Sequence, residues 1–94
     1  MNTMVTENVK VEIYSTGLCP YCIRAKKLLD HKGVEYIEYR VDKNPSMRIE
    51  MEQRSHRTSV PQIFIANQHV GGFDDISELD IMDELDPMLG LKSV

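Results

Sequence analysis

The 94-residue chain contains no tryptophan, only two cysteines and no long apolar run. A membrane helix needs roughly 18–20 consecutive apolar residues, and two cysteines are too few for a disulfide-stapled secreted scaffold. The first eight residues show neither the basic nor the apolar segment of a signal peptide, so a cytoplasmic protein is expected. The excess of 15 acidic over 11 basic residues opposes non-specific nucleic-acid binding. We therefore expect one small globular domain that binds neither membrane nor nucleic acid.

The charged residues are unevenly distributed. Residues 9–57 carry ten basic and seven acidic side chains, whereas residues 58–94 carry one basic and seven acidic side chains. The simpler interpretation is a solvated acidic face on the last helix. The alternative is that the basic segment surrounds the cysteines and attracts an anionic substrate.

The periodicity of apolar residues predicts seven elements. Strands are expected over 9–14, 34–41, 62–66 and 69–71, and helices over 20–32, over 45–55 after an Asn44 cap, and from a capping box at Asp75 and Glu78 towards Pro87. The first strand, helix and strand form a βαβ unit with parallel strands. A two-residue turn, Asn67-Gln68, makes the last strand pair antiparallel. The prediction is an α/β fold in the order β-α-β-α-β-β-α, a four-stranded mixed sheet flanked by three helices.

The domain is expected to span residues 9–90. Residues 1–8 precede the first periodic segment and are expected to form a disordered tail. Pro87 and Gly90 are expected to end the ordered chain, so residues 91–94 form a short C-terminal tail.

The two cysteines, Cys19 and Cys22, have C-x-x-C spacing where the first strand gives way to the first helix. Pro20 suits the first helical position, because it lacks the N–H that would be unpaired there. Cys19 then lies at the helix N-terminus, where free N–H groups and the helix dipole favour a thiolate over a thiol. Cys22 lies almost one turn further along, within bonding reach and turned toward the core. We expect Cys19 to be the nucleophile and Cys22 the resolving thiol.

Other functions of the cysteine pair are less well supported. A zinc site needs about four ligands, and the three histidines, His31, His56 and His69, form no ligand-spaced pair. A structural disulfide would close a very short loop and add little stability. Inert cysteines at a helix start are a third alternative. The C-x-x-C motif in a βαβ context favours redox chemistry, with no metal and no tightly bound cofactor.

Two further segments are candidates for a binding site. Pro61 is compatible with a trans turn, the commoner form, or with a cis bond that presents the main chain of Val60 as an edge for a peptide-like substrate. Gly71 and Gly72 precede a helix N-terminus whose free N–H groups could bind a carboxylate. A plain hairpin-to-helix turn would have a similar sequence.

Together these segments resemble the glutaredoxins, specifically the dithiol class, and most closely the bacterial glutaredoxin 3 type. The similar segments are Val11–Tyr14, Cys19-Pro20-Tyr21-Cys22 with Arg24–Lys26, Ser59–Ile65 and Gly71–Asp75. The resemblance covers about residues 9–90. It implies a thioredoxin-like fold with Pro61 cis, and it implies glutathione as electron donor and co-substrate.

The resemblance also implies how glutathione binds. The glutathione sulfur would meet Cys19, its peptide would pair with the main chain of Val60, and its γ-glutamyl carboxylate would lie at the start of the last helix. The residues that the resemblance assigns to this site are Tyr21, Ser59, Val60, Pro61, Gly72, Phe73 and Asp74.

The chain departs from the family pattern at two positions. Thr16 stands where many relatives have a lysine that supports the thiolate and binds the glycine carboxylate. Arg57 or Arg54 could supply this missing charge. Ser59 replaces the usual threonine and keeps its hydroxyl, so little effect is expected.

The activity that the resemblance implies is thiol–disulfide exchange in electron transport and cell redox homeostasis. Reduction of protein–glutathione mixed disulfides would need only Cys19, whereas reduction of protein disulfides would also need Cys22. Ribonucleotide reductase is one candidate substrate protein. A monomer is expected. Two alternatives are a thioredoxin-type reductase and an iron–sulfur carrier in which two chains and two glutathiones hold one cluster. The lack of tryptophan opposes the first, and Pro20 opposes the second.

Overall fold

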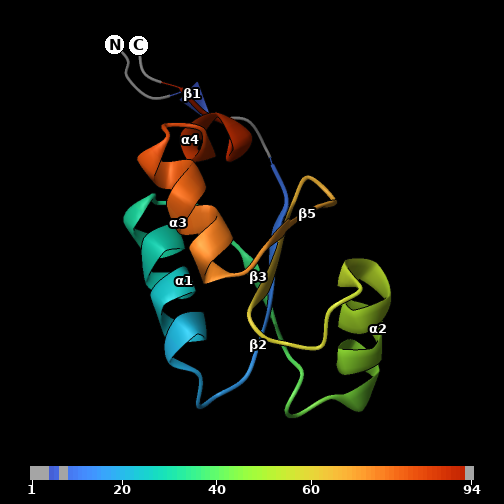
Figure 1. The fold of residues 1–94 in the computed structure, drawn as a ribbon. Coiled ribbons are helices and arrows are strands. Elements are labelled where there is room, and N and C mark those ends of the chain that lie inside the picture. The colour runs from blue at the N-terminus through green and yellow to red at the C-terminus, as the bar shows by residue number, and fades with distance from the viewer. Residues whose placement is uncertain (1–4, 7–8, 93–94) are drawn as a thin grey trace.

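The computed structural model describes residues 5–6 and 9–92. In chain order the elements are β1 (Val5–Thr6), β2 (Val11–Ser15), α1 (Pro20–His31), β3 (Ile37–Arg40), α2 (Pro45–Ser55), β4 (Gln62–Ile65), β5 (Gln68–Gly71), α3 (Phe73–Ile81), α4 (Leu85–Met88) and β6 (Leu91–Lys92). Helices α1 and α3 lie on one face of the central sheet and α2 lies on the other (Figure 1). None of the helices in the described ranges is long and apolar enough to cross a membrane.

The central sheet has the strand order β3-β2-β4-β5. Strands β2 and β3 are parallel, whereas β2 with β4 and β4 with β5 are antiparallel. The predicted α/β fold with a four-stranded mixed sheet is therefore confirmed. The pairing of β2 with β4 matters most for the site, because it brings the end of β2, which leads to the cysteines, beside the start of β4.

Two hydrophobic clusters hold the helices against the sheet. Successive residues of a strand point to opposite faces, so Ile13 and Ile63 pack toward α1 and α3, while Tyr14 and Phe64 pack toward α2. All four side chains are at most 2% exposed. The continuous apolar run of β4 thus reflects a central strand that is covered on both faces.

The structure differs from the prediction at the C-terminal end. A fourth helix, α4, contains Pro87, which was expected to end the ordered chain. Proline is tolerated in the first turn of a helix, and burial of Leu85 and Leu89 in the core holds α4 in place. Lys32 at the end of α1 contacts carboxylates of both α3 and α4, with its Nζ 2.9 Å from Asp86 Oδ1.

The predicted tails also differ in part from the structure. Strand β1, inside the predicted N-terminal tail, pairs antiparallel with β6, inside the predicted C-terminal tail. The two short segments form a second, two-stranded sheet. The remaining tail residues, 1–4, 7–8 and 93–94, lie outside the described residues.

Three local boundaries also shift. Helix α3 begins at Phe73 with Gly72 as its cap, rather than at Asp75, because the Asp75 carboxylate accepts the Gly72 N–H at 2.8 Å and so acts as the third residue of the capping box. The hairpin turn lies at Ala66 and Asn67, which both have positive φ, so β5 starts at Gln68, one residue earlier than predicted. Strand β3 is shorter than the predicted 34–41.

Candidate active site

Cys19 and Cys22 lie at the start of α1, with Cys19 as the N-cap and Pro20 in the first turn. The Sγ of Cys19 accepts a hydrogen bond from the backbone N–H of Cys22, with a sulfur–nitrogen distance of 3.1 Å. Cys19 is 8% exposed and Cys22 is fully buried. Cys19 thus lies at the helix N-terminus, as the sequence predicted. Its sulfur accepts the N–H that a serine or aspartate oxygen would accept at an N-cap.

The loop between β2 and α1 is fixed by a pair of charged residues from the end of β3. Arg40 donates to both carboxylate oxygens of Asp42, and Asp42 accepts the backbone N–H of Gly17 at 3.1 Å. A Cβ at Gly17 would lie 2.4 Å from Arg40 Nη2, so the glycine allows the guanidinium to pack against the loop. The loop that leads to Cys19 is thereby tied to β3.

The two thiols differ in their environment. Burial raises the pKa of Cys22 to about 12, the hydrogen bond with Cys19 acts in the same direction, and a backbone hydrogen bond from Thr16 acts against it. Cys22 therefore keeps its proton in the neutral pH range. The Cys22 N–H and the α1 N-terminus, in contrast, stabilise negative charge on the sulfur of Cys19.

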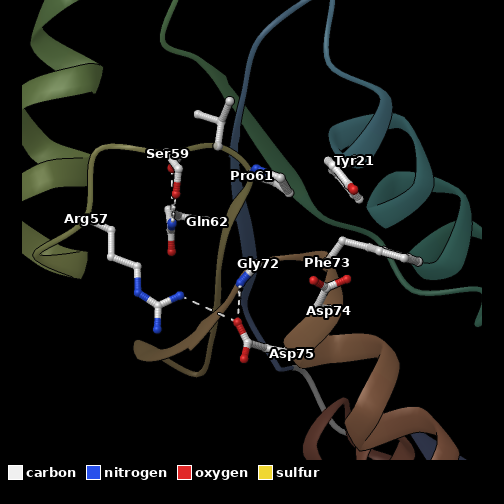
Figure 2. Close-up of a pocket in the computed structure, with 10 residues that line it drawn as sticks. Tyr21, Arg57, Ser59, Pro61, Gln62, Gly72, Phe73, Asp74 and Asp75 are labelled. Atoms are coloured by element: carbon white, nitrogen blue, oxygen red, sulfur yellow. Dashed lines mark hydrogen bonds and ion pairs between the residues drawn. The ribbon is translucent and has the colours of Figure 1, made fainter.

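A pocket of about 220 Å³ is lined by residues from α1, from the segment that leads into β4 and from the start of α3. Figure 2 shows their side chains around it. All seven residues that the resemblance assigned to glutathione line this pocket, together with Arg57, Gln62 and Asp75. The Val60–Pro61 bond is cis, as the resemblance implied. The Cys19 Sγ lies 3.9 Å from the carbonyl oxygen of Val60, which lines the pocket just before β4. The thiol is therefore next to one wall of the pocket.

Aromatic side chains form one rim of the pocket. The ring of Tyr21, 52% exposed, lies 6.4 Å from the ring of Phe73 between centroids. The guanidinium of Arg24 lies 5.3 Å from the centroid of the Tyr21 ring. Since Tyr21 follows Cys19 by two residues in α1 and Phe73 opens α3, this rim joins the two helices that carry the site.

The N-terminus of α3 opens toward the same pocket. Gly72, the cap, has no side chain, and the N–H groups of Phe73 and Asp74 in the first turn have no acceptor within the helix. The Gly72 N–H itself donates to the Asp75 carboxylate. The first turn of α3 therefore offers main-chain donors at the pocket, with the exposed carboxylate of Asp74 beside them.

The structure separates the residues considered as charge support. Arg57 lines the pocket, 51% exposed, with its Nη1 3.5 Å from Asp75 Oδ2. Arg54 lies elsewhere, because it binds the carboxylate of Glu12 and lies 3.9 Å above the Phe64 ring. Thr16 lies beside Cys22 and is not among the residues that line the pocket. Of the charges weighed from sequence, Arg57 is the one at the pocket.

Sequence analysis missed Gln62 and gave Asp75 a different role. Gln62 is the single polar residue in the apolar run that became β4, and that exception was the available signal. The sequence predicts that Asp75 begins a capping box, whereas its contacts with Gly72 and Arg57 depend on where α3 meets the segment before β4. No group of three or more His, Cys, Asp or Glu side chains in the described ranges could hold a metal ion.

Comparison with known proteins adds independent evidence. The family model for glutaredoxin matches residues 11–70. The chain is 56% identical to glutaredoxin 3 of Escherichia coli over 79 residues, which are 84% of this chain and 95% of that protein. It is 48% identical to a glutaredoxin of Pseudomonas aeruginosa, over 84% of this chain and 94% of the relative.

Solved structures that superpose on this chain include glutaredoxins. A buckwheat glutaredoxin in complex with glutathione superposes with a TM-score of 0.79 at 31% identity, over 86% of this chain and 76% of that one. A glutaredoxin of Brucella melitensis superposes with a TM-score of 0.76 at 47% identity, over 86% and 88%. Together with the thioredoxin-like fold and the thiol pair at the start of α1, these matches show that the chain belongs to the glutaredoxin family and is a thiol–disulfide oxidoreductase.

Proposed function

We propose that the protein takes electrons from glutathione to reduce protein–glutathione mixed disulfides and protein disulfides. The observation that carries the proposal is the pocket beside Cys19, in which the main chain of Val60 and the N-terminus of α3 face the same space. The glutathione complex of the buckwheat relative supports the choice of ligand.

The chemistry of the pocket matches the groups of glutathione in turn. The N–H groups of Phe73 and Asp74 suit the γ-glutamyl carboxylate, and the Asp74 carboxylate suits the neighbouring ammonium. The main chain of Val60 suits the cysteinyl peptide as an added strand. The Arg57 guanidinium suits the glycine carboxylate. Tyr21, Ser59, Pro61 and Gly72 complete the lining.

In the first reaction, Cys19 alone exchanges a glutathione unit. The Cys19 thiolate attacks the glutathione sulfur of a mixed disulfide, and the target protein leaves as a thiolate that takes a proton from water. A second glutathione thiolate then attacks the sulfur of the glutathione bound to Cys19. This step releases glutathione disulfide and restores the Cys19 thiolate, so Cys22 is not needed.

The second reaction uses both thiols. Attack of Cys19 on a protein disulfide leaves a mixed disulfide at Cys19. Cys22 then loses its proton and attacks the Cys19 sulfur, which releases the second substrate thiol and forms the Cys19–Cys22 disulfide. Two glutathione molecules reduce that disulfide and are oxidised to one glutathione disulfide. The dithiol arrangement favours this oxidoreductase over the iron–sulfur carrier that the sequence left open.

The proposal extends to where and on what the protein acts. We propose that it works as a monomer in the cytoplasm, where the glutathione pool supplies the electrons. Its partners are glutathione and glutathionylated or disulfide-containing proteins, of which ribonucleotide reductase is one candidate. Glutathione acts as co-substrate, and the proposed cycle uses no tightly bound cofactor.

The test is an assay with a glutathionylated peptide, glutathione, glutathione reductase and NADPH, run in parallel with thioredoxin reductase in place of glutathione and its reductase. We expect NADPH oxidation in the glutathione arm and none from the Cys19→Ser variant. Activity in the thioredoxin reductase arm alone would overturn the proposed role of the pocket.

A further inference from the structure

The segment of residues 57–61, which forms one wall of the pocket, is shaped by side chains rather than by its own main chain. Across residues 9–92, no main-chain hydrogen bond outside the helices and strands involves this segment. Side chains serve its polar groups instead. The Ser55 Oγ accepts the Arg57 N–H at 3.1 Å, and Arg48 donates to the Thr58 carbonyl at 3.4 Å. The wall therefore depends on the residues that support it.

Gln62 supports this wall at the position next to Val60. Its side chain is only 1% exposed, although it lines the pocket. Its Nε2 donates to the carbonyl oxygen of Ser59 at 3.0 Å and lies 3.3 Å from the Ser59 Oγ (Figure 2). Since Ser59 immediately precedes Val60, this amide fixes the peptide unit from which the Val60 main chain continues.

The Ser59 carbonyl and His69 hold the two ends of the Gln62 amide. The Ser59 carbonyl can only accept, so it takes the Gln62 NH₂ and turns Oε1 toward His69, whose Nε2 lies 2.7 Å away. The His69 tautomer that fits this amide carries its proton on Nε2 and donates it. The His69 ring packs on Phe64, with 5.0 Å between centroids. A reversed amide would set Gln62 Oε1 against the Ser59 carbonyl and leave the histidine N–H facing an NH₂ group.

We propose that Gln62, held at its Oε1 by His69, is a positioning residue that holds the Ser59–Val60 main chain in the geometry that receives the glutathione peptide. The inference rests on the proposed function. Gln62 acts through the main chain, and the bond-making chemistry stays with the cysteines. The specific consequence is that the chain from His69 through Gln62 to Ser59 controls binding of the glutathionyl group rather than attack by Cys19.

The first test replaces Gln62 with methionine, which has a similar length and no hydrogen-bonding amide. Loss of the bond to Ser59 should raise KM for a glutathionylated peptide about tenfold, with kcat unchanged. Gln68→Met is the matched control, because Gln68 is exposed on β5. The control should leave both constants unchanged.

The second test uses two variants of the histidine. His69→Phe keeps a ring to pack on Phe64 but has no donor, so Gln62 Oε1 loses its partner, the amide is held at one end only, and KM should rise about threefold. His69→Gln keeps a donor and should return KM towards the wild-type value. If Gln62→Met fails to fold, this pair carries the test, because His69 is only partly buried.

A readout of the chemistry separates positioning from general damage. The rate at which iodoacetamide alkylates Cys19 reports the reactivity of the thiolate without requiring a glutathionyl group to bind, and it should be equal in all variants. Unchanged KM in a folded Gln62→Met protein, or a parallel fall in kcat and alkylation rate, would overturn the inference alone. A wild-type protein inactive with glutathione would overturn the proposed function, and the inference with it.

Discussion

The backbone N–H of Cys22 points at the sulfur of Cys19 across 3.1 Å, while the sulfur of Cys22 is fully buried. One residue thus supplies both a donor that stabilises the nucleophile and the thiol that later attacks it. This relationship follows from the C-x-x-C spacing, because the third residue after an N-cap is the one whose N–H reaches the cap side chain.

The difference between the two thiols predicts selective alkylation. Iodoacetamide at neutral pH should modify Cys19 and leave Cys22 unmodified, because burial raises the pKa of Cys22 to about 12. Mass spectrometry of proteolytic fragments of the reduced protein measures this directly. In denaturant both thiols should react, which provides the control. Equal modification in the folded protein would contradict the assigned environments.

Substitution of each cysteine should separate the two proposed reactions. Cys19→Ser should abolish both, since Cys22 is buried. Cys22→Ser should keep reduction of a glutathionylated peptide and lose reduction of a protein disulfide. The glutathione reductase–coupled assay measures the first, and loss of free thiols in a disulfide substrate assay measures the second. If Cys22→Ser lost both activities, the roles of the cysteines would have to be reassigned.

The raised pKa of Cys22 also predicts a dependence of stability on pH. The thiol has an ordinary pKa of 9.0 in the unfolded chain and about 12 in the folded protein. The folded protein therefore retains this proton where the unfolded chain has lost it. The contribution to the free energy of unfolding is full below pH 9 and is lost as pH rises towards 12.

Urea unfolding of the reduced protein should show this effect against Cys22→Ala as reference. Between about pH 9 and 11 the wild type should lose more stability than the variant, by about 1.4 kcal/mol for each pH unit. Parallel curves for the two proteins would mean that the Cys22 thiol is more accessible than its burial indicates.

The two arginines weighed from sequence should give opposite phenotypes. Arg57→Gln changes an exposed side chain at the pocket, so KM for a glutathionylated peptide should rise about tenfold with little change in stability. Arg54→Met leaves the carboxylate of Glu12, only 3% exposed, without its main partner, and should lower the free energy of unfolding by about 3 kcal/mol. Michaelis kinetics and urea unfolding of both variants check this, and a reversed pattern would contradict the assignment.

Gly71 should be intolerant of a side chain for two reasons. Its φ of +125° disfavours any other residue, and a Cβ there would lie 2.1 Å from Asp75 Oδ2, the atom that binds Gly72 and faces Arg57. Gly71→Ala should lower stability by about 1–3 kcal/mol and raise KM for the glutathionylated peptide.

Gly33→Ala is the control for the cost of placing a side chain on a residue with positive φ. Gly33 also has positive φ, but a Cβ there meets nothing within 4 Å. It should lower the thermal midpoint modestly and leave KM unchanged. Equal effects of the two substitutions on KM would show that displacement of Asp75 does not matter for the pocket.

Much of the fold and part of the site were predictable because they depend on local patterns. Proline after Cys19 and proline after Asn44 each mark a helix start, and both starts are found where predicted. The end of the chain was harder. Pro87 is a local stop signal, but burial of Leu85 in the shared core outweighs it and stabilises α4.

The sequence by itself determined the thiol pair, its place at a helix N-terminus and the order of the elements that surround it. These features arise from contacts between residues a few positions apart. Only the tertiary structure decided that Cys19 lies next to Val60, that Arg57 rather than Arg54 reaches the pocket, and that Gln62 lines it. Those contacts depend on the pairing of β2 with β4 and on side-chain packing between distant segments, which no local pattern specifies.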